Sequence, residues 1–188
     1  MHPLRTHIER ITPLTDQEFS YILGHFEEKK LRKHQYLVQA GTYDRFDNWV
    51  LGGCLKAFYT DQEGKDHILQ FAAEDWWIAD YQAYFNQTPA TINIDCMEDC
   101  QLLQLSVHKR EKICSEMHKM EHFFRKKVTS GYIALQQRIL SLLTHNPRGR
   151  YEEFLRLYPN LSSRIPKKYI AAYLGVSRET LSRLYNEN

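Results

Sequence analysis

The chain has 188 residues, of which 43% are hydrophobic and 26% are charged, as is usual for a globular protein. No apolar run approaches the roughly 20 residues of a membrane span, and the N-terminus has no apolar signal core, which excludes a membrane partner and indicates a cytoplasmic protein. The net charge of +2 hides an asymmetry, because residues 1–118 hold 12 basic and 18 acidic residues whereas residues 119–188 hold 13 and 5. A basic C-terminal third is suited to phosphate contact.

The first 30 residues or so are predicted to be helical. Thr15 and Glu18 have the spacing of a capping box, in which each residue's side chain accepts a hydrogen bond from the other's backbone N–H. An apolar stripe at helical spacing follows, made of Phe19, Ile22, Leu23 and Phe26.

Between Lys33 and Leu105, short alternating apolar stretches are separated by turn signals. The stretches begin at Tyr36, Asn48, Leu55, His67, Thr91 and Gln101, and the turns contain Gly41, Gly53 and Gly64. Strands at intervals of about 8–12 residues are typical of a sandwich or roll. This segment is therefore predicted to be all-β.

Helix is predicted again over residues 107–117 and, without interruption, over about 119–145. A helix of about 27 residues is about 40 Å long, more than one small domain needs to cover itself. We therefore predict a homodimer joined along an apolar stripe of the long helix, with a glycine for close backbone approach. The stripe consists of Phe124, Val128, Gly131, Tyr132, Leu135 and Ile139. Packing of this helix along its own β segment is the alternative.

Two short helices separated by a tight turn are predicted between residues 165 and 185. Pro166 suits a first helical turn, Gly175 can end that helix at positive φ, and Ser177 can cap the next helix. Ala171 is small where the helices cross, and Leu181 is an apolar anchor, as in a helix-turn-helix.

The polar side of the second helix carries arginine, glutamate and serine, which can bond to base edges in the major groove. We predict that Arg178, Glu179 and Arg183 contact bases of double-stranded DNA. Phosphate contact or positioning is predicted for Lys167, Lys168, Ser177, Thr180 and Ser182. An ordinary helical hairpin with a solvated charged side is the alternative.

The order helix, β-roll, long helix and helix-turn-helix resembles the CRP/FNR family of bacterial transcription regulators over about residues 15–186. The run SRET at Ser177–Thr180, with Arg183, resembles the family's recognition helix. Gly41, the turn at 61–64 and the run from Asp75 to Asp80 resemble the turns and entry of its cyclic-nucleotide cassette.

The resemblance implies an α+β fold in three parts. Residues 1–117 would form a cyclic-nucleotide-binding-like sensor domain, a double-stranded β-helix or jelly-roll that is also similar to the cupin roll. Residues 118–145 would form the dimerisation helix. Residues 146–188 would form a helix-turn-helix DNA-binding domain whose wing, unlike that of most family members, is truncated or missing. Either other residues supply the phosphate contacts, with Arg148, Arg164, Lys167 and Lys168 as candidates, or DNA binding is weak.

The ligand positions depart from the family pattern. Members that bind cyclic AMP carry a glycine and a glutamate in the cassette and an Arg-Ser pair about ten residues later. The corresponding residues here are Ala79, Asp80, Ala90 and Thr91, and an anion buried without its arginine is costly. We predict no control by cyclic AMP and a degenerate effector pocket lined by those four residues with Trp77 and Tyr81.

Cysteines and histidines do not form a recognisable site. Cys54, Cys96, Cys100 and Cys114 lack the spacing of an iron–sulfur motif and are predicted to be reduced, structural thiols. His67 stands alone in its strand, where cupin enzymes carry a His-x-His pair, and His118 with His122 lacks a third ligand. We expect no metal, no cofactor and no enzymatic activity.

The sequence thus predicts a sequence-specific transcription regulator that binds a palindromic DNA site as a homodimer. RNA polymerase and an unidentified small-molecule effector are candidate further partners. The alternative is a ligand-sensing or protein-interaction module with a degenerate helix-turn-helix.

Overall fold

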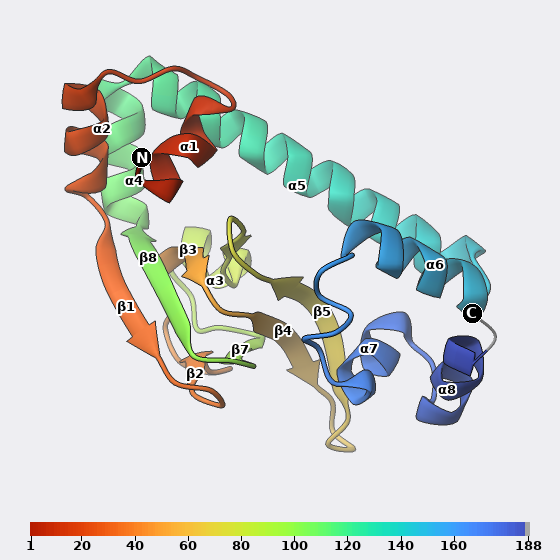
Figure 1. The fold of residues 1–188 in the computed structure, drawn as a ribbon. Helices are drawn as coiled ribbons and strands as arrows, with labels where there is room; N and C mark the ends of the chain where they lie inside the picture. The colour runs from red at the N-terminus through yellow and green to blue at the C-terminus, as the bar shows by residue number, and fades with distance from the viewer. Residues whose placement is uncertain (187–188) are drawn as a thin grey trace.

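A computed structural model describes residues 1–186 of the chain. Figure 1 shows one long helix along one side of a β-roll, with short helices gathered at both of its ends. The helices are α1 (Pro3–Glu9), α2 (Asp16–Leu23), α3 (Tyr81–Asn86), α4 (Val107–Glu116), α5 (His118–Thr144), α6 (Pro147–Leu157), α7 (Lys167–Leu174) and α8 (Arg178–Asn186). The strands are β1 (Glu27–Leu31), β2 (Tyr36–Val38), β3 (Phe46–Gly52), β4 (Leu55–Thr60), β5 (Asp66–Ala72), β6 (Trp77–Ile78), β7 (Asn93–Cys96) and β8 (Cys100–Ser106).

The prediction of helix up to residue 30 was correct only in part. The capping box of Thr15 and Glu18 is confirmed at the start of α2. Residues 27–31, however, form strand β1, which pairs antiparallel with β8 and places Glu27 opposite Gln104. The run Glu-Glu-Lys-Lys has no apolar stripe to bury as a helix, and pairing with β8 satisfies its backbone instead.

The predicted all-β segment is confirmed as a roll of two antiparallel four-stranded sheets, with strand orders β1-β8-β3-β6 and β2-β7-β4-β5. The space between the sheets is filled by small and branched side chains, among them Val50, Leu55, Ile94 and Leu102. Strand β6 and helix α3 were not predicted.

The outer face of the first sheet is covered by α1, α2, α4 and the beginning of α5. Trp49 and Leu105 of the sheet pack there with Ile8, Ile113 and Phe123 of the helices. Phe124 belongs to the same cluster, is only 4% exposed and lies against Trp77. Its assignment to the dimer stripe is therefore corrected, because its own chain already buries it.

The outer face of the second sheet is covered by α6, α7 and the loop between them. Phe58 and Phe71 of the sheet form one hydrophobic cluster with Phe154, Ile170 and Tyr173. The C-terminal helices thus share a core with the roll. Residues 187–188 of the predicted third part lie outside the described residues.

Helix α5 confirms the predicted long helix almost to the residue. Beyond its first two turns most of its side chains are exposed. Within residues 1–186, no helix is long and apolar enough to cross a membrane.

Candidate functional site

The α7–α8 pair is built by the local features that the sequence contains. Gly175 ends α7 at a φ of +66°, in the left-handed region, and its N–H donates to Ala171 and Ala172 carbonyls. The Ser177 hydroxyl accepts from the Thr180 N–H at 3.2 Å and so caps α8. The turn between the helices is therefore only three residues long, Gly175 to Ser177.

The two sides of this pair differ sharply in exposure. Ala171, Leu174 and Leu181 are buried, as the predicted crossing and anchor require. On α8 and its cap, the exposed residues are Ser177, Arg178, Glu179, Ser182 and Arg183, while Thr180 is half-buried. The structure thus places these predicted contact residues together on one helix, with the base-edge candidates turned to solvent.

Two exposed lysines lie at the start of α7. The Lys167 ammonium is 3.8 Å from the centroid of the Tyr185 ring, and that of Lys168 is 4.5 Å from the Tyr169 ring. Each lysine ammonium makes a cation–π contact with the ring, which attracts the cation and leaves its positive charge in place. On α8, the backbone N–H of Glu179 and the Ser177 side chain lower the pKa of the Glu179 carboxyl, so this group is an acceptor at neutral pH.

Two arginines that sequence reasoning missed bind the carboxyl end of α7. Arg138 of α5 donates to the Tyr173 carbonyl and lies over the Tyr173 ring at 3.6 Å. Arg150 of α6 donates to the Leu174 carbonyl at 2.9 Å. Cations are favourable at a helix C-terminus, and these two arginines tie α7 to the long helix α5 and to α6.

Arg164 was predicted as a phosphate contact, and the structure shows it otherwise engaged. Its guanidinium donates to Glu74 at 2.8 and 3.0 Å and to Glu98 at 3.0 and 2.6 Å. Glu98 and Glu74 raise the pKa of Arg164. Because both carboxylates bind Arg164, this residue links the C-terminal helices to the roll. Its positive charge is neutralised within the chain and is not presented to a DNA phosphate. Arg148, the other suggested contact, pairs with Glu152 at 3.0 Å.

The long helix presents an uncovered apolar stripe. Val128, Tyr132, Leu135 and Ile139 are exposed, Tyr132 by 68% and Leu135 by 58%. Gly131 is also exposed, and a Cβ built there would meet nothing within 4 Å. Leu142 and Leu143 extend the stripe toward α6. Apart from Phe124, the predicted stripe residues are all available to a partner.

The predicted effector pocket is occupied by the chain's own polar bonds. Asp80 caps α3 and accepts from the backbone N–H of Thr91 at 2.7 Å and of Ile92 at 3.3 Å, and from the Thr91 hydroxyl at 3.1 Å. Burial acts to raise the pKa of Asp80, but the N–H groups of Thr91, Ala83 and Ile92 hold it below its usual value. Ala79 and Ala90 are buried, Trp77 is half-buried and Tyr81 is exposed.

A buried charged cluster lies beside this pocket. Burial raises the pKa of both Asp44 and Asp47 to about 6. Asp47 pairs with Arg110 of α4 at 3.3 Å and accepts from the Tyr81 hydroxyl. The Tyr84 hydroxyl is buried without a hydrogen-bond partner. Nothing in the sequence pattern marked this cluster, because its members come from β3, the residues just before it, α3 and α4.

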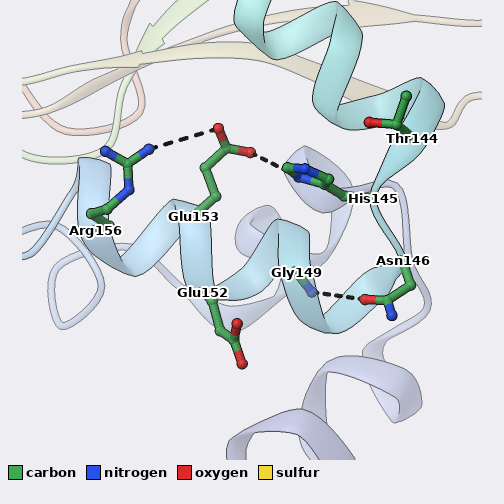
Figure 2. A pocket seen from close by; sticks show the side chains of 7 residues that line it. All are labelled: Thr144, His145, Asn146, Gly149, Glu152, Glu153 and Arg156. Carbon is green, nitrogen blue, oxygen red and sulfur yellow. Dashed lines mark hydrogen bonds and ion pairs between the residues drawn. The ribbon is translucent and has the colours of Figure 1, made fainter.

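An open hollow of about 570 Å³ lies where α5 meets α6 (Figure 2). Glu153 contacts three side chains at this hollow. Its carboxylate lies 3.6 Å from His145 and 3.9 Å from Arg156, and it accepts a hydrogen bond from the buried Ser141 hydroxyl. No group of three or more His, Cys, Asp or Glu side chains among residues 1–186 could hold a metal ion.

Comparisons with known proteins agree with this architecture. Residues 28–117 match the family model of the cyclic nucleotide-binding domain. The roll has the fold of that domain. No curated protein sequence matches the chain.

Three solved structures share the fold over most of this chain. The c-di-GMP-responsive global regulator CLP of Xanthomonas campestris has 11% identity over 92% of this chain and 91% of its own, with a TM-score of 0.71. FixK2 from Bradyrhizobium japonicum has 14% identity, coverage of 86% and 83%, and a TM-score of 0.74. A CooA mutant from Carboxydothermus hydrogenoformans has 21% identity, coverage of 89% and 78%, and a TM-score of 0.68. Because these alignments cover 86% to 92% of this chain, the similarity in fold to these proteins is not confined to the roll.

Proposed function

We propose that the chain is a sequence-specific, DNA-binding transcription regulator of the CRP/FNR type that acts in the cytoplasm as a homodimer on a palindromic site. It is a non-enzymatic protein in this proposal. The observation that carries it is the exposed set of Arg178, Glu179 and Arg183 on a short helix that is anchored on its other side by the buried Leu181. A solved relative in fold, CLP, is described as a global regulator of virulence gene expression.

The exposed side chains have the chemistry that base reading needs. Arginine can donate two hydrogen bonds to guanine, and glutamate can accept from the amino group of cytosine. In this proposal, DNA bases are contacted by Arg178, Glu179 and Arg183. Phosphates are contacted, or the helix is positioned, by Ser177, Thr180 and Ser182. Lys167 and Lys168 supply further phosphate contacts.

The dimer forms along α5 in this proposal. Val128, Tyr132, Leu135 and Ile139 of one protomer pack against the same residues of the other, and Gly131 allows the backbones to approach closely. Since Arg138 ties α7 to α5, pairing of the two long helices also fixes the distance between the two α8 helices. A palindromic site requires that distance to be about one turn of duplex, near 34 Å.

The occupied pocket argues against control by cyclic AMP. A cyclic phosphate seated at Thr91 would compete with the Asp80 carboxylate for the same N–H groups, with Ala90 in place of a balancing arginine. We therefore propose that a different effector acts on the domain. Calorimetry tests this point directly, and micromolar or tighter affinity for cyclic AMP would contradict it.

Selection of bound fragments from a random duplex pool tests the function. The proposal requires enrichment of a palindrome and a preference over random duplex that persists at two salt concentrations. Uniform binding to all sequences would reduce the helix pair to a non-specific contact.

The second candidate function is a protein-interaction or ligand-sensing module. It is favoured by the sharing of one hydrophobic cluster between the α7–α8 pair and the roll, because such burial alone could account for these helices. A dimer that binds no duplex even at low salt would establish this alternative.

A further inference from the structure

The segment Glu74–Trp77, which leads from β5 into β6, contacts two parts of the molecule that otherwise have separate cores. Glu74 and Asp75 form a turn, in which the Trp76 N–H donates to the Ala73 carbonyl at 3.1 Å. Glu74 and Trp76 contact the C-terminal part, whereas Asp75 and Trp77 contact the N-terminal helices. The segment then continues through β6 into Ala79 and Asp80 of the predicted effector pocket.

On the C-terminal side, the contacts are an ion-pair clamp and a ring contact. Glu74 receives two hydrogen bonds from Arg164 and one from the Gly53 N–H at 3.0 Å. Arg164 lowers the pKa of Glu74, so the carboxylate stays charged. Two residues on, the Trp76 ring lies 5.4 Å from the Tyr158 ring, in the loop that leads to α7.

On the N-terminal side, the contacts converge on one buried histidine of α1. The His7 Nδ1 lies 2.5 Å from Asp75, and its Nε2 accepts from the Trp77 indole N–H at 3.1 Å. Since Nε2 is an acceptor, Nδ1 carries the proton and donates to Asp75. Arg10 also binds Asp75. Asp75 has a φ of +75°, in a region that a non-glycine residue enters only when its surroundings hold it there.

Several hydrogen bonds hold the segment to the roll. Val50 of β3 donates to the Trp76 carbonyl at 2.8 Å and accepts from the Asp75 N–H at 2.9 Å. Trp77 pairs with Trp49 of β3, and its carbonyl accepts from the Gln70 side chain at 3.2 Å. Because neighbouring residues of one firmly held turn carry both sets of contacts, a displacement of Asp75 on the N-terminal side also displaces Glu74 on the C-terminal side.

We infer that residues 74–77 are a joint that couples the placement of α7 and α8 to the N-terminal helices and the effector pocket, and that Arg164 is the positioning residue on the output side. The joint holds the DNA-reading pair in one orientation relative to α5. Its consequence for DNA rests on the proposed function, whereas the coupling itself does not.

Amide hydrogen exchange of residues 167–185 in the full-length protein tests the coupling without DNA. Arg164→Gln should speed exchange there by releasing the clamp. Asp75→Asn, which weakens the bonds to His7 and Arg10 and touches no C-terminal residue, should also speed it, by about fivefold or more. In the Arg164→Gln background the same Asp75→Asn change should have little further effect.

Arg156→Gln is the matched control. It removes one cation from α6, where Arg156 pairs only weakly with Glu153 at 3.9 Å, and it should leave the exchange of residues 167–185 unchanged. If Asp75→Asn does not fold, Trp77→Phe gives a second test, because it removes the indole N–H bound to His7 together with part of the ring that packs against Phe26 and Phe124.

Unchanged exchange in Asp75→Asn, or equal effects of that change with and without Arg164, would overturn the joint. In the DNA arm, Arg164→Gln should weaken binding to the selected palindrome while base preferences stay the same. A protein that binds no duplex would defeat the proposed function, and the exchange data would still decide the coupling.

Discussion

Leu135→Glu should abolish the dimer while leaving the protomer folded. Leu135 is 58% exposed on α5 and lies at the middle of the apolar stripe. Complete burial of a leucine is worth about 1.5–3 kcal/mol, so covering its exposed half contributes about 1–1.5 kcal/mol in each protomer. Twofold symmetry doubles this to about 2–3 kcal/mol, a weakening of about 30- to 150-fold in the dimer dissociation constant. Two facing carboxylates in the seam add a desolvation and repulsion cost.

Sedimentation velocity over a concentration series measures this change. The control is Leu69→Glu, since Leu69 is 50% exposed on β5 and is not part of the stripe. Leu69→Glu should remain as dimeric as the wild type, and both variants should keep the wild-type circular dichroism. A monomeric wild type, or a Leu135→Glu variant that dimerises normally, would refute the reasoning about α5.

Three further predictions concern the reading helix, the buried carboxyl and the helix turn. Arg178→Ala should cost about 1–3 kcal/mol in binding and relax preference at one base position, whereas Lys168→Ala should weaken all sequences alike and reduce the salt slope by about one; binding titrations across base variants and salt concentrations separate these. Because burial raises the pKa of Asp47 to about 6, the folded state takes up this proton more readily than the unfolded state. Stability from this group is therefore fully present below about pH 4 and lost as pH rises to about 6, by at most about 3 kcal/mol; urea unfolding of Asp47→Asn should show a flatter profile than wild type between about pH 4 and 6, and parallel profiles would contradict this. Gly175→Ala should destabilise by about 1 kcal/mol in thermal unfolding, since φ is +66° but a Cβ there meets nothing within 4 Å; an unchanged melting temperature would speak against a strained turn.

Local signals predicted most of the elements correctly. The capping box at Thr15, the strands from Tyr36 to Leu105, the long helix and the Gly175 turn are all marked in the sequence by patterns of neighbouring residues, although the strands pair with distant ones. Strand β1 was missed because its stability comes from β8, about 70 residues away, and a run of glutamate and lysine carries no strand signal of its own.

The candidate site was predictable where side chains face solvent and not where they pair within the chain. Arg178 and Arg183 are exposed as the helical spacing indicated. Arg164 has the same chemistry and the same neighbourhood, yet Glu74 and Glu98 bind it. Phe124 continues the apolar spacing of Val128 and Leu135, but the α5 helix passes from the roll into the open between them. Long-range partners decide such cases, and a single sequence does not reveal them.

The common core of Phe71, Phe154 and Tyr173 also determines what proteolytic cleavage of the chain would do. A protease cut near His145 would not release an independently folded C-terminal fragment. Residues 147–186 would lose Phe71 of the roll, against which Phe154 and Tyr173 pack. The N-terminal fragment would in turn expose the apolar outer face of the second sheet and tend to aggregate. Cleavage at this junction would therefore destabilise both fragments.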